Sequence, residues 1–505
     1  MTWYVDPVGP VAETCRVVVV GAGAGGAFVA LTLAQAGLDV VLVEDGYHFA
    51  PSGFAPELGE VLADCYAEGG MRTMQGAPPI PLPGGRGLGG STLVNSAICF
   101  RTPRNVVDDW NEQTDGAFAD VDEFYREQDG VEAMIGVRRT PDELLSGNDR
   151  AQRQAARAMG WAETNLRRNT PGCQGCQRCN SGCPVGGKGS VDRSVLPLAA
   201  AAGARIYTGC RVDTLTPNRV AGPVITRDGA RVGDFEVKAD VVVLCAGAVS
   251  TPRLLLDLGL VDRGGPVGRG LQVHPVLGVH AQLPGSWYSR GATQGHVVTE
   301  FADEEVIFES NPVIAGAIFQ ALPLVGRPLQ EALTRCEGYV SSGALIRDKS
   351  TGRVRTSLAS AAARVTYKLN RHDRDRFVKA GRRLARMWFE GMGAEWVLPA
   401  VYGAPLCRDM DEFRRALSRD VGPERLIGYA SHPQSTCAIG RATDQDGQLL
   451  ELPGVYCMDA SALPTNVGRN PQVTVMTVAR LLAAKLARRL GGAVKPLPAP
   501  VPGSP

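Results

Sequence analysis

The sequence has few aromatic residues and no long uninterrupted run of apolar residues. Aromatic side chains make up 6 % of the 505 residues. No segment reaches the roughly 18 apolar residues that a membrane-spanning helix requires. Residues 1–16 also lack the basic start and the apolar run of a signal peptide. A transmembrane segment is therefore not expected, and a cytoplasmic location is the default prediction.

An excess of either charge is also missing. The 53 Lys and Arg residues nearly balance the 52 Asp and Glu residues, so the formal net charge is +1. This balance argues against a nucleic-acid or polyanionic partner. Hydrophobic residues make up 44 %, close to the average of globular proteins. A chain of this length can form two or three domains, or one large interrupted domain with a sizeable core.

Glycine and cysteine, by contrast, are abundant, with 61 and 13 residues. Many glycines are typical of loops that approach a ligand closely. Nine of the cysteines are scattered, several in apolar runs such as V-V-V-L-C-A-G at 241–247. This pattern indicates buried thiols in a reducing compartment rather than a disulfide framework.

A dinucleotide-binding motif lies near the N-terminus. Residues 16–26 read R-V-V-V-V-G-A-G-A-G-G, in which Gly21, Gly23 and Gly26 follow a short buried strand and open a helix. A second apolar strand ends in Glu44. In this βαβ context the first glycine makes the turn, the second lets the backbone reach the pyrophosphate, and the third allows helix–strand packing. The pyrophosphate sits at the helix N-terminus, and the acid accepts hydrogen bonds from the ribose.

Two further glycine turns follow. Residues 84–95 read G-G-R-G-L-G-G-S-T-L-V-N, with Ser91 and Thr92 as expected caps of a following helix. Such a loop can donate backbone N–H groups to a flat ring system, although an ordinary connection fits equally well. Residues 239–259 predict a buried strand, a glycine turn and a helix that opens around Pro252.

Three stretches together resemble the glucose–methanol–choline (GMC) oxidoreductases. Residues 85–95 are similar to the first family signature, and residues 247–259 to the second, although Leu258 stands where the family usually has serine. Residues 459–474, D-A-S-A-L-P-T-N-V-G-R-N-P-Q-V-T, resemble the C-terminal motif. The resemblance implies an α/β fold with bound FAD. It also implies a doubly wound, Rossmann-like FAD domain assembled from discontinuous segments, and a substrate domain with an antiparallel sheet.

The resemblance also implies a division of the chain. The FAD-binding domain is expected at 14–105, 186–273 and 440–492, and the substrate or cap domain at 106–185 and 274–439. Residues 493–505 are Pro-rich and are expected to be extended or disordered.

The same resemblance assigns the cofactor-binding residues. Gly21, Gly23, Gly26 and Glu44 are expected to bind the ADP half of FAD, and the backbone of Val212 to contact the adenine. The pyrophosphate or flavin is expected to contact Gly89, Gly90, Ser91 and Asn95, and the ribityl chain and pyrophosphate to contact Asp459 and Ala460. Asn470, Pro471 and Val473 are expected near the isoalloxazine, with Ala246 as a further cofactor contact.

His432 and Asn470 form the expected catalytic pair. The stretch S-H-P-Q-S-T-C-A-I-G (431–440) resembles the family motif H-x-x-G-T-x-x-M-G, with Ser435 and Ile439 at the departures. A lone histidine is more often structural, but an imidazole is a suitable acceptor for the hydroxyl proton of an alcohol. The flavin accepts the hydride. Asn470 cannot act as a base, but its amide can orient the substrate oxygen. The prediction is oxidation of an alcohol to an aldehyde or ketone.

The substrate and the remaining histidines are less constrained. His274 is interpreted as structural, whereas His280 and His296 lie in the region expected to bind substrate. Residues 308–325 can form core or line an apolar pocket. The layout most resembles long-chain fatty alcohol oxidases and their bacterial relatives, which implies a lipophilic alcohol; a sterol, terpenoid, sugar or biosynthetic intermediate stays open. A flavin-dependent lyase, isomerase or decarboxylase, or an electron-relay protein, are the alternatives on the same fold.

A cysteine run raises a separate question. Cys173, Cys176, Cys179 and Cys183 have the C-x2-C-x2-C-x3-C spacing of bacterial ferredoxins, within a glycine-rich loop at 171–190. Zinc would require two C-x2-C pairs at longer separation, or histidines. Disulfides, an iron–sulfur cluster and free structural thiols are the other interpretations. In two-cluster ferredoxins the fourth cysteine serves the other cluster, and no second run exists here. A three-iron cluster or a remote fourth ligand is therefore considered.

The choice bears on the electron acceptor. A cluster would pass electrons singly to a redox protein or quinone, as in a dehydrogenase acting on a sugar or sterol. Without a cluster, oxygen is the simpler acceptor and peroxide the product.

Overall fold

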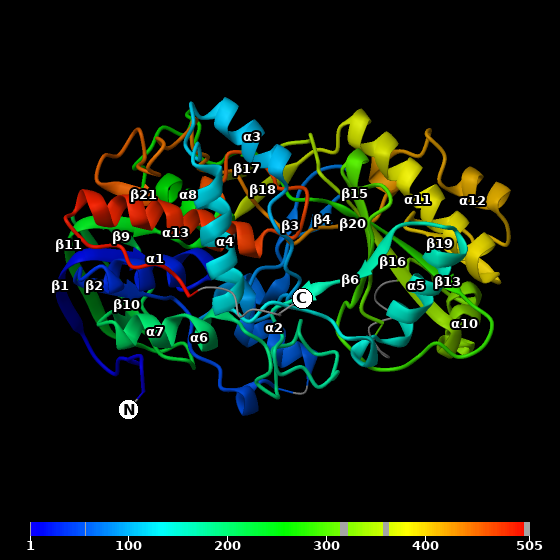
Figure 1. Ribbon diagram of the computed structural model, residues 1–505, viewed down its shortest axis with the longest axis horizontal. Coiled ribbons are helices and arrows are strands. Elements are labelled where there is room, and N and C mark those ends of the chain that lie inside the picture. Colours follow the sequence, from blue (N-terminus) through cyan, green and yellow to red (C-terminus); the bar gives the residue numbers. More distant parts are fainter. Residues whose placement is uncertain (1, 56, 314–321, 357–362, 499–505) are drawn as a thin grey trace.

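A computed structural model describes residues 2–55, 57–313, 322–356 and 363–498. Two larger β-sheets lie at opposite ends of the molecule (Figure 1). The sheet at the left contains the N-terminal strand, and the sheet at the right is formed by the middle of the chain. Residues 314–321 of the apolar segment 308–325 and residues 499–505 of the Pro-rich tail lie outside the described residues.

The first sheet is mostly parallel and has the order β8-β2-β1-β11-β10-β9, with β21 paired to β11. Its strands are β1 (Val11–Val20), β2 (Val40–Val43), β8 (Arg205–Tyr207), β9 (Thr214–Thr216), β10 (Arg219–Ile225), β11 (Arg231–Leu244) and β21 (Val455–Cys457). Val43, Val20, Leu244 and Cys457 are register partners, so the parallel strands β2, β1, β11 and β21 end level with one another. Segments from distant parts of the sequence therefore meet at one sheet edge.

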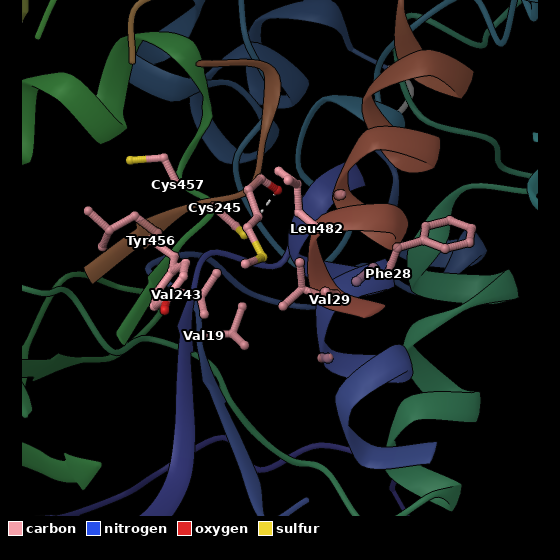
Figure 2. Close-up of a cluster of buried hydrophobic side chains, with 14 of the residues drawn as sticks. Val19, Phe28, Val29, Val243, Cys245, Tyr456, Cys457 and Leu482 are labelled. Atoms are coloured by element: carbon pink, nitrogen blue, oxygen red, sulfur yellow. Dashed lines mark hydrogen bonds between the residues drawn. The ribbon is translucent and has the colours of Figure 1, made fainter. Parts of the chain in front are cut away.

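Helices cover this sheet because their apolar faces match its buried valines. α1 (Ala24–Gln35) packs against α13 (Gln472–Arg489), and α7 (Leu196–Ala201) contacts α1. Figure 2 shows this core, in which Val29 and Leu482 of the helices lie near Val19 and Val243 of the strands, whereas the ring of Phe28 points away from them. Cys245 lies in the same cluster, where its thiol donates to the Met458 carbonyl oxygen at 3.4 Å.

The second sheet is antiparallel and has the order β19-β13-β16-β15-β14-β6, with β20 paired to β13. Its strands are β6 (Glu163–Asn165), β13 (Val276–Gln282), β14 (His296–Val298), β15 (Val306–Ser310), β16 (Tyr339–Ile346), β19 (Trp396–Pro399) and β20 (Gly428–Tyr429). α5 (Gly147–Ala158) and α11 (Arg371–Met392) pack on it. The predicted combination of an α/β FAD-binding fold with an antiparallel substrate sheet is confirmed.

Smaller elements complete the fold. They are β3 (Thr73–Met74), β4 (Ile80–Pro81), β5 (Arg138–Arg139), β7 (Arg167–Arg168), β12 (Arg269–Leu271), β17 (Gly352–Arg355) and β18 (Arg364–Tyr367), with helices α2 (Leu58–Cys65), α3 (Arg104–Gln113), α4 (Val121–Met134), α6 (Val191–Ser194), α8 (Gly247–Asp257), α10 (Arg327–Thr334) and α12 (Met410–Ala416).

The start of the substrate domain differs from the prediction at residue 106. α4 packs against α13, and Trp110 and Phe124 belong to the core of the first sheet. Both side chains are fully buried there. Residues 106–134 are therefore part of the FAD-side core. The remaining domain boundaries stay predictions.

Two local predictions also need correction. α8 begins at Gly247 rather than near Pro252, so the proline lies inside the helix and cannot donate to the Ala248 carbonyl oxygen. The hydroxyl of Thr436 donates to that oxygen instead, at 2.7 Å. Ser91 and Thr92 do not cap a long helix but form a single 3-10 turn, Gly90–Thr92. The Pro-rich residues 493–498 have no regular structure, as expected of an extended tail.

Candidate active site

The first glycine loop has two crowded positions and one open position. A Cβ atom at Gly21 would lie 2.6 Å from the Cys245 carbonyl oxygen, and one at Gly26 would lie 1.9 Å from the Gly21 carbonyl oxygen. At Gly23 the nearest atom would be the Gly90 Cα, 3.9 Å away. Gly21 and Gly26 are therefore needed for packing, whereas Gly23 faces space that a phosphate can occupy.

Glu44 joins the two glycine loops. One carboxylate oxygen accepts from Ala22 N at 2.9 Å, and the other accepts from Gly46 N at 2.9 Å and Gly87 N at 3.1 Å. Gly89 N also donates to the Ala22 carbonyl oxygen at 3.0 Å. Burial raises the pKa of Glu44, and the three N–H donors oppose that shift. Glu44 thus fixes the loop geometry, and its contact with the ribose stays a prediction.

Asp459 fastens a third segment to the same edge. Its carboxylate accepts from Gly247 N and the Thr251 hydroxyl at 2.7 Å each, at the start of α8. Burial raises its pKa. Ala246 lies beside the first glycine turn, where a Cβ at Gly21 would come within 3.0 Å of its Cα. The starts of α1 and α8 therefore meet at the carboxyl ends of adjacent parallel strands, where doubly wound folds bind their ligands.

The remaining loop residues connect to α13. Asn95 donates from its amide to the Gln472 side-chain oxygen at 3.0 Å, next to Pro471 and Val473. Ser91 accepts from Gly85 N at 3.0 Å, which stabilises the second glycine loop. Asn95 thus lies at the N-terminus of α13, beside Pro471 and Val473.

The backbone N–H of Val212 is oriented away from the neighbouring strand β10. Arg211 N donates to Pro223 O at 3.2 Å and Asp213 N donates to Ala221 O at 3.0 Å, both toward β10. Backbone groups alternate along an extended chain, so the N–H of Val212 points away from β10. This orientation is compatible with the predicted adenine contact.

His432 is poised as a proton acceptor. Its Nδ1 atom is buried and has no hydrogen-bond partner among the described residues. Protein atoms surround the side chain, although part of its surface stays accessible. This burial lowers the pKa of His432 to about 4, so the imidazole is neutral at neutral pH. Ser435 N donates to the Ala460 carbonyl oxygen at 3.0 Å, which ties this segment to the Asp459 turn.

His274 connects His432 with the segment that carries Asn470. The two imidazole rings meet edge to face with centroids 5.5 Å apart, and Gly468 N donates to His274 Nε2 at 2.8 Å. Asn470 is buried, and its Oδ1 atom has no hydrogen-bond partner in the described part of the chain. His274 thus contacts both the His432 ring and the backbone two residues before Asn470.

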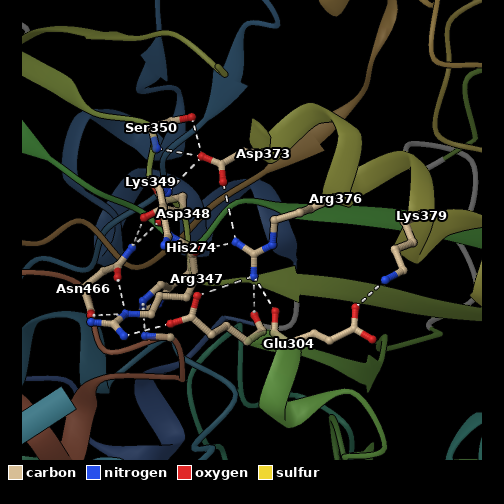
Figure 3. A network of polar contacts seen from close by, with 12 residues as sticks. His274, Glu304, Arg347, Asp348, Lys349, Ser350, Asp373, Arg376, Lys379 and Asn466 are labelled. Carbon is tan, nitrogen blue, oxygen red and sulfur yellow. Dashed lines mark hydrogen bonds and ion pairs between the residues drawn. The ribbon is translucent and has the colours of Figure 1, made fainter. Parts of the chain in front are cut away.

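A polar network holds His274 in place. Its backbone N–H donates to Asp348 Oδ1 at 3.0 Å, and the Asn466 amide donates to the same oxygen at 2.6 Å (Figure 3). His274 has a positive φ of 47° and is fully buried. These contacts agree with its interpretation as a structural residue. His280 and His296 bond within the antiparallel sheet, to Tyr339 and Glu163 respectively, and do not join the site.

The sequence analysis missed Glu309 on β15. Its carboxyl group is buried and faces Asn470 and Gln294, and its Oε1 atom has no hydrogen-bond partner among the described residues. Burial raises the pKa of Glu309 to about 7, against the smaller opposing effects of Asn470 and the Arg469 guanidinium. A single acid inside the buried run V-I-F-E-S was the signal available in the sequence.

We expect Glu309 to destabilise the protein as the pH rises from about 4.5 to about 7. The folded state holds the carboxyl proton more tightly than the unfolded state, so stability is lost as the proton leaves. At pH 8 the Glu309→Gln variant should therefore be more stable than the wild type by up to about 3 kcal/mol, with little difference at pH 5. Urea unfolding at both pH values measures this. The exposed Glu60→Gln control should show no such pH-dependent gain, and an equal gain in both variants would contradict the prediction.

The cysteine run forms a loop without helix or strand, as predicted. All 13 cysteines are described, and none forms a disulfide. Cys173, Cys176, Cys179 and Cys183 line one pocket together with Lys188. Among the described residues, no three His, Cys, Asp or Glu side chains are arranged to hold a single metal ion.

Comparison with known proteins decides the family. Models described as GMC oxidoreductase match residues 62–276 and 348–479, and a model described as FAD binding domain matches residues 16–54. The chain belongs to the GMC oxidoreductase family. It is therefore a flavoprotein with FAD as cofactor. The open space at Gly23 fits that group, as do the polar atoms of His432 and Asn470 that have no partner within the described ranges.

Relatives of this GMC oxidoreductase include two kinds of protein. An uncharacterized GMC-type oxidoreductase of Mycobacterium tuberculosis is 35 % identical, covering 94 % of this chain and 76 % of the relative. The long-chain-alcohol oxidase FAO3 of Arabidopsis thaliana is 28 % identical, covering 94 % and 68 %.

Solved structures share the fold at low sequence identity. Pyridoxine 4-oxidase from Mesorbium loti matches with a TM-score of 0.67 and 19 % identity, over 94 % of this chain and 99 % of that one. A formate oxidase matches with a TM-score of 0.65 and 16 % identity, over 95 % and 99 %. Within the described ranges, the helices of this GMC oxidoreductase are too short or too polar to cross a membrane.

Proposed function

We propose that this GMC oxidoreductase oxidises an alcohol to an aldehyde or ketone, with His432 as the base and Asn470 as the residue that orients the substrate oxygen. The observation that carries the proposal is the half-buried imidazole of His432, whose Nδ1 atom has no hydrogen-bond partner among the described residues. A neutral imidazole can take the hydroxyl proton as the carbinol carbon loses its hydride. FAD, when bound, supplies the hydride acceptor.

The proposed role of Asn470 follows from its chemistry and its support. A carboxamide offers both a donor and an acceptor but does not change its charge, so it can hold a hydroxyl oxygen in one orientation. The Gly468–His274 hydrogen bond restrains the neighbouring backbone. His274 therefore acts as a positioning residue for both members of the pair.

The proposed substrate is a lipophilic primary or secondary alcohol. Similarity to long-chain-alcohol oxidases along 94 % of the chain supports this class. The proposed electron acceptor is oxygen or a redox protein or quinone. The substrate domain contains a large cluster of buried apolar side chains. A lipophilic substrate chain would pack against side chains of the same kind.

A series of straight-chain primary alcohols tests the substrate class. Each methylene group that enters an apolar channel contributes about 0.8 kcal/mol, or roughly fourfold in affinity. We expect the alcohol concentration for half-maximal anaerobic flavin reduction to fall by up to that factor for each added carbon. A diol with a hydroxyl at both ends should bind more weakly than the alkanol of equal length, because its second hydroxyl must leave water to enter an apolar channel. Flavin reduction by sugars but by none of the alkanols would overturn the substrate proposal.

A further inference from the structure

In the loop at 171–190, backbone N–H groups donate hydrogen bonds to cysteine sulfur atoms. Gly175 N donates to Cys173 Sγ at 3.5 Å, and Arg178 N donates to the thiol of Cys176. Both bonds run from the second residue after the cysteine. Gly175 and Gln177 have positive φ angles of 70° and 63°, which these tight turns require. Backbone N–H donors of this kind orient sulfur atoms and stabilise negative charge on them.

All four cysteines of the run line one pocket. Its lining includes Cys173, Cys176, Cys179 and Cys183, and none of the nine scattered cysteines. The fourth cysteine therefore lines the same pocket as the first three. This answers the question that the ferredoxin spacing leaves open, because no remote cysteine is needed to complete a set of four.

Two buried cations lie against this pocket. The Arg168 guanidinium, 1 % exposed, donates to Ser96 O at 3.1 and 3.0 Å and to Cys179 Sγ at 3.1 Å. The Lys188 ammonium donates to the carbonyl oxygens of residues 93, 95 and 179 at 3.1, 2.6 and 3.2 Å. These hydrogen bonds go to carbonyl oxygens and a sulfur rather than to carboxylates. The carboxylates of Asp192 and Asp149 attract Lys188 and Arg168 respectively but do not hydrogen-bond to them. Further negative charge at the pocket would stabilise both cations.

We propose that Cys173, Cys176, Cys179 and Cys183 together ligate one iron–sulfur cluster. Four thiolates around such a cluster carry net negative charge, which Arg168 and Lys188 balance. A single tetrahedral zinc ion would require sulfur atoms about 3.8 Å apart, whereas each thiolate of a four-iron cluster bonds a different iron atom.

The position of the loop gives the cluster a role. Lys188 donates to the carbonyl oxygens of Leu93 and Asn95, which belong to the second glycine loop, predicted to contact the cofactor. This consequence rests on the proposed function: alcohol oxidation would leave two electrons on the cofactor. A cluster held by the four cysteines would then allow these electrons to pass one at a time to a one-electron acceptor protein.

Metal analysis of the whole protein tests the ligation itself. Protein purified without oxygen should contain about four iron and four acid-labile sulfide per chain. It should also show broad visible absorption beneath the FAD bands, and a paramagnetic signal after reduction with dithionite. Cys173→Ala and Cys183→Ala should each lose most of the iron and sulfide. Cys336→Ala, which removes an exposed thiol far along the chain, should retain both.

Several results would overturn the proposal. They are FAD-loaded wild-type protein without iron or sulfide even after anaerobic reconstitution with ferrous iron and sulfide, stoichiometric zinc, or disulfide-linked peptides from this loop. Iron retained in both alanine variants would do the same. FAD content shows whether each variant has folded. Because iron and sulfide are measured without any alcohol, failure of the cluster proposal and failure of the proposed function are distinguishable.

Discussion

Replacing His432 with alanine is expected to leave FAD bound and to slow alcohol-dependent reduction of the flavin by about 10²–10⁴-fold. The imidazole is the neutral group proposed to take the hydroxyl proton, and an alanine offers no acceptor. Its removal leaves the glycine loops and Glu44 unchanged, so the cofactor site should persist. Anaerobic stopped-flow measurement of flavin absorbance reports the rate directly.

The matched control for this variant is His372→Ala. His372 is an exposed histidine on α11, so its loss should change neither FAD content nor reduction rate. Imidazole added to the His432→Ala protein should restore part of the rate if the missing group is a base. Near wild-type reduction by the His432→Ala protein, with FAD fully bound, would exclude His432 as the base.

The sequence predicts the cofactor half of the fold because its signals are local. The strand, the glycine turn and the helix around Gly21 lie within one βαβ unit, and each residue type has a separate steric reason. The level ends of β2, β1, β11 and β21 then follow from parallel pairing. The start of α8 was misplaced because Pro252 marks a helix start in isolation. A distant residue, Thr436, satisfies the carbonyl group that the proline leaves free.

The rest could not be predicted because it depends on pairs distant in sequence. Nothing near Trp110 indicates that its helix packs on the FAD side, since an amphipathic helix can cover either core. The pKa of Glu309 is raised because its carboxyl group is buried beside Asn470, which lies 161 residues further along the chain. Similarly, the cysteine spacing suggests a cluster, but only the folded structure shows that Arg168 and Lys188 lie next to Cys179.

Alanine at Gly23 and at Gly26 should separate cofactor contact from packing. At Gly26 the new Cβ would lie 1.9 Å from the Gly21 carbonyl oxygen, so α1 must move away from β1. We expect Gly26→Ala to lose FAD and to destabilise the apoprotein by about 1–3 kcal/mol, as overpacked positions do. At Gly23 no atom lies closer than 3.9 Å, and its φ of −77° suits alanine.

Gly23→Ala should therefore leave the apoprotein within about 0.5 kcal/mol of the wild type, as for a surface substitution. It should still weaken FAD binding by about tenfold or more, equivalent to ~1.4 kcal/mol, because the methyl group enters the space next to Gly90 where the pyrophosphate is expected. Urea unfolding of the apoproteins and titration with FAD measure the two effects independently. Unchanged FAD affinity in Gly23→Ala would place the pyrophosphate elsewhere. Equal apoprotein destabilisation by both variants would show that Gly23, too, is required for packing rather than for the ligand.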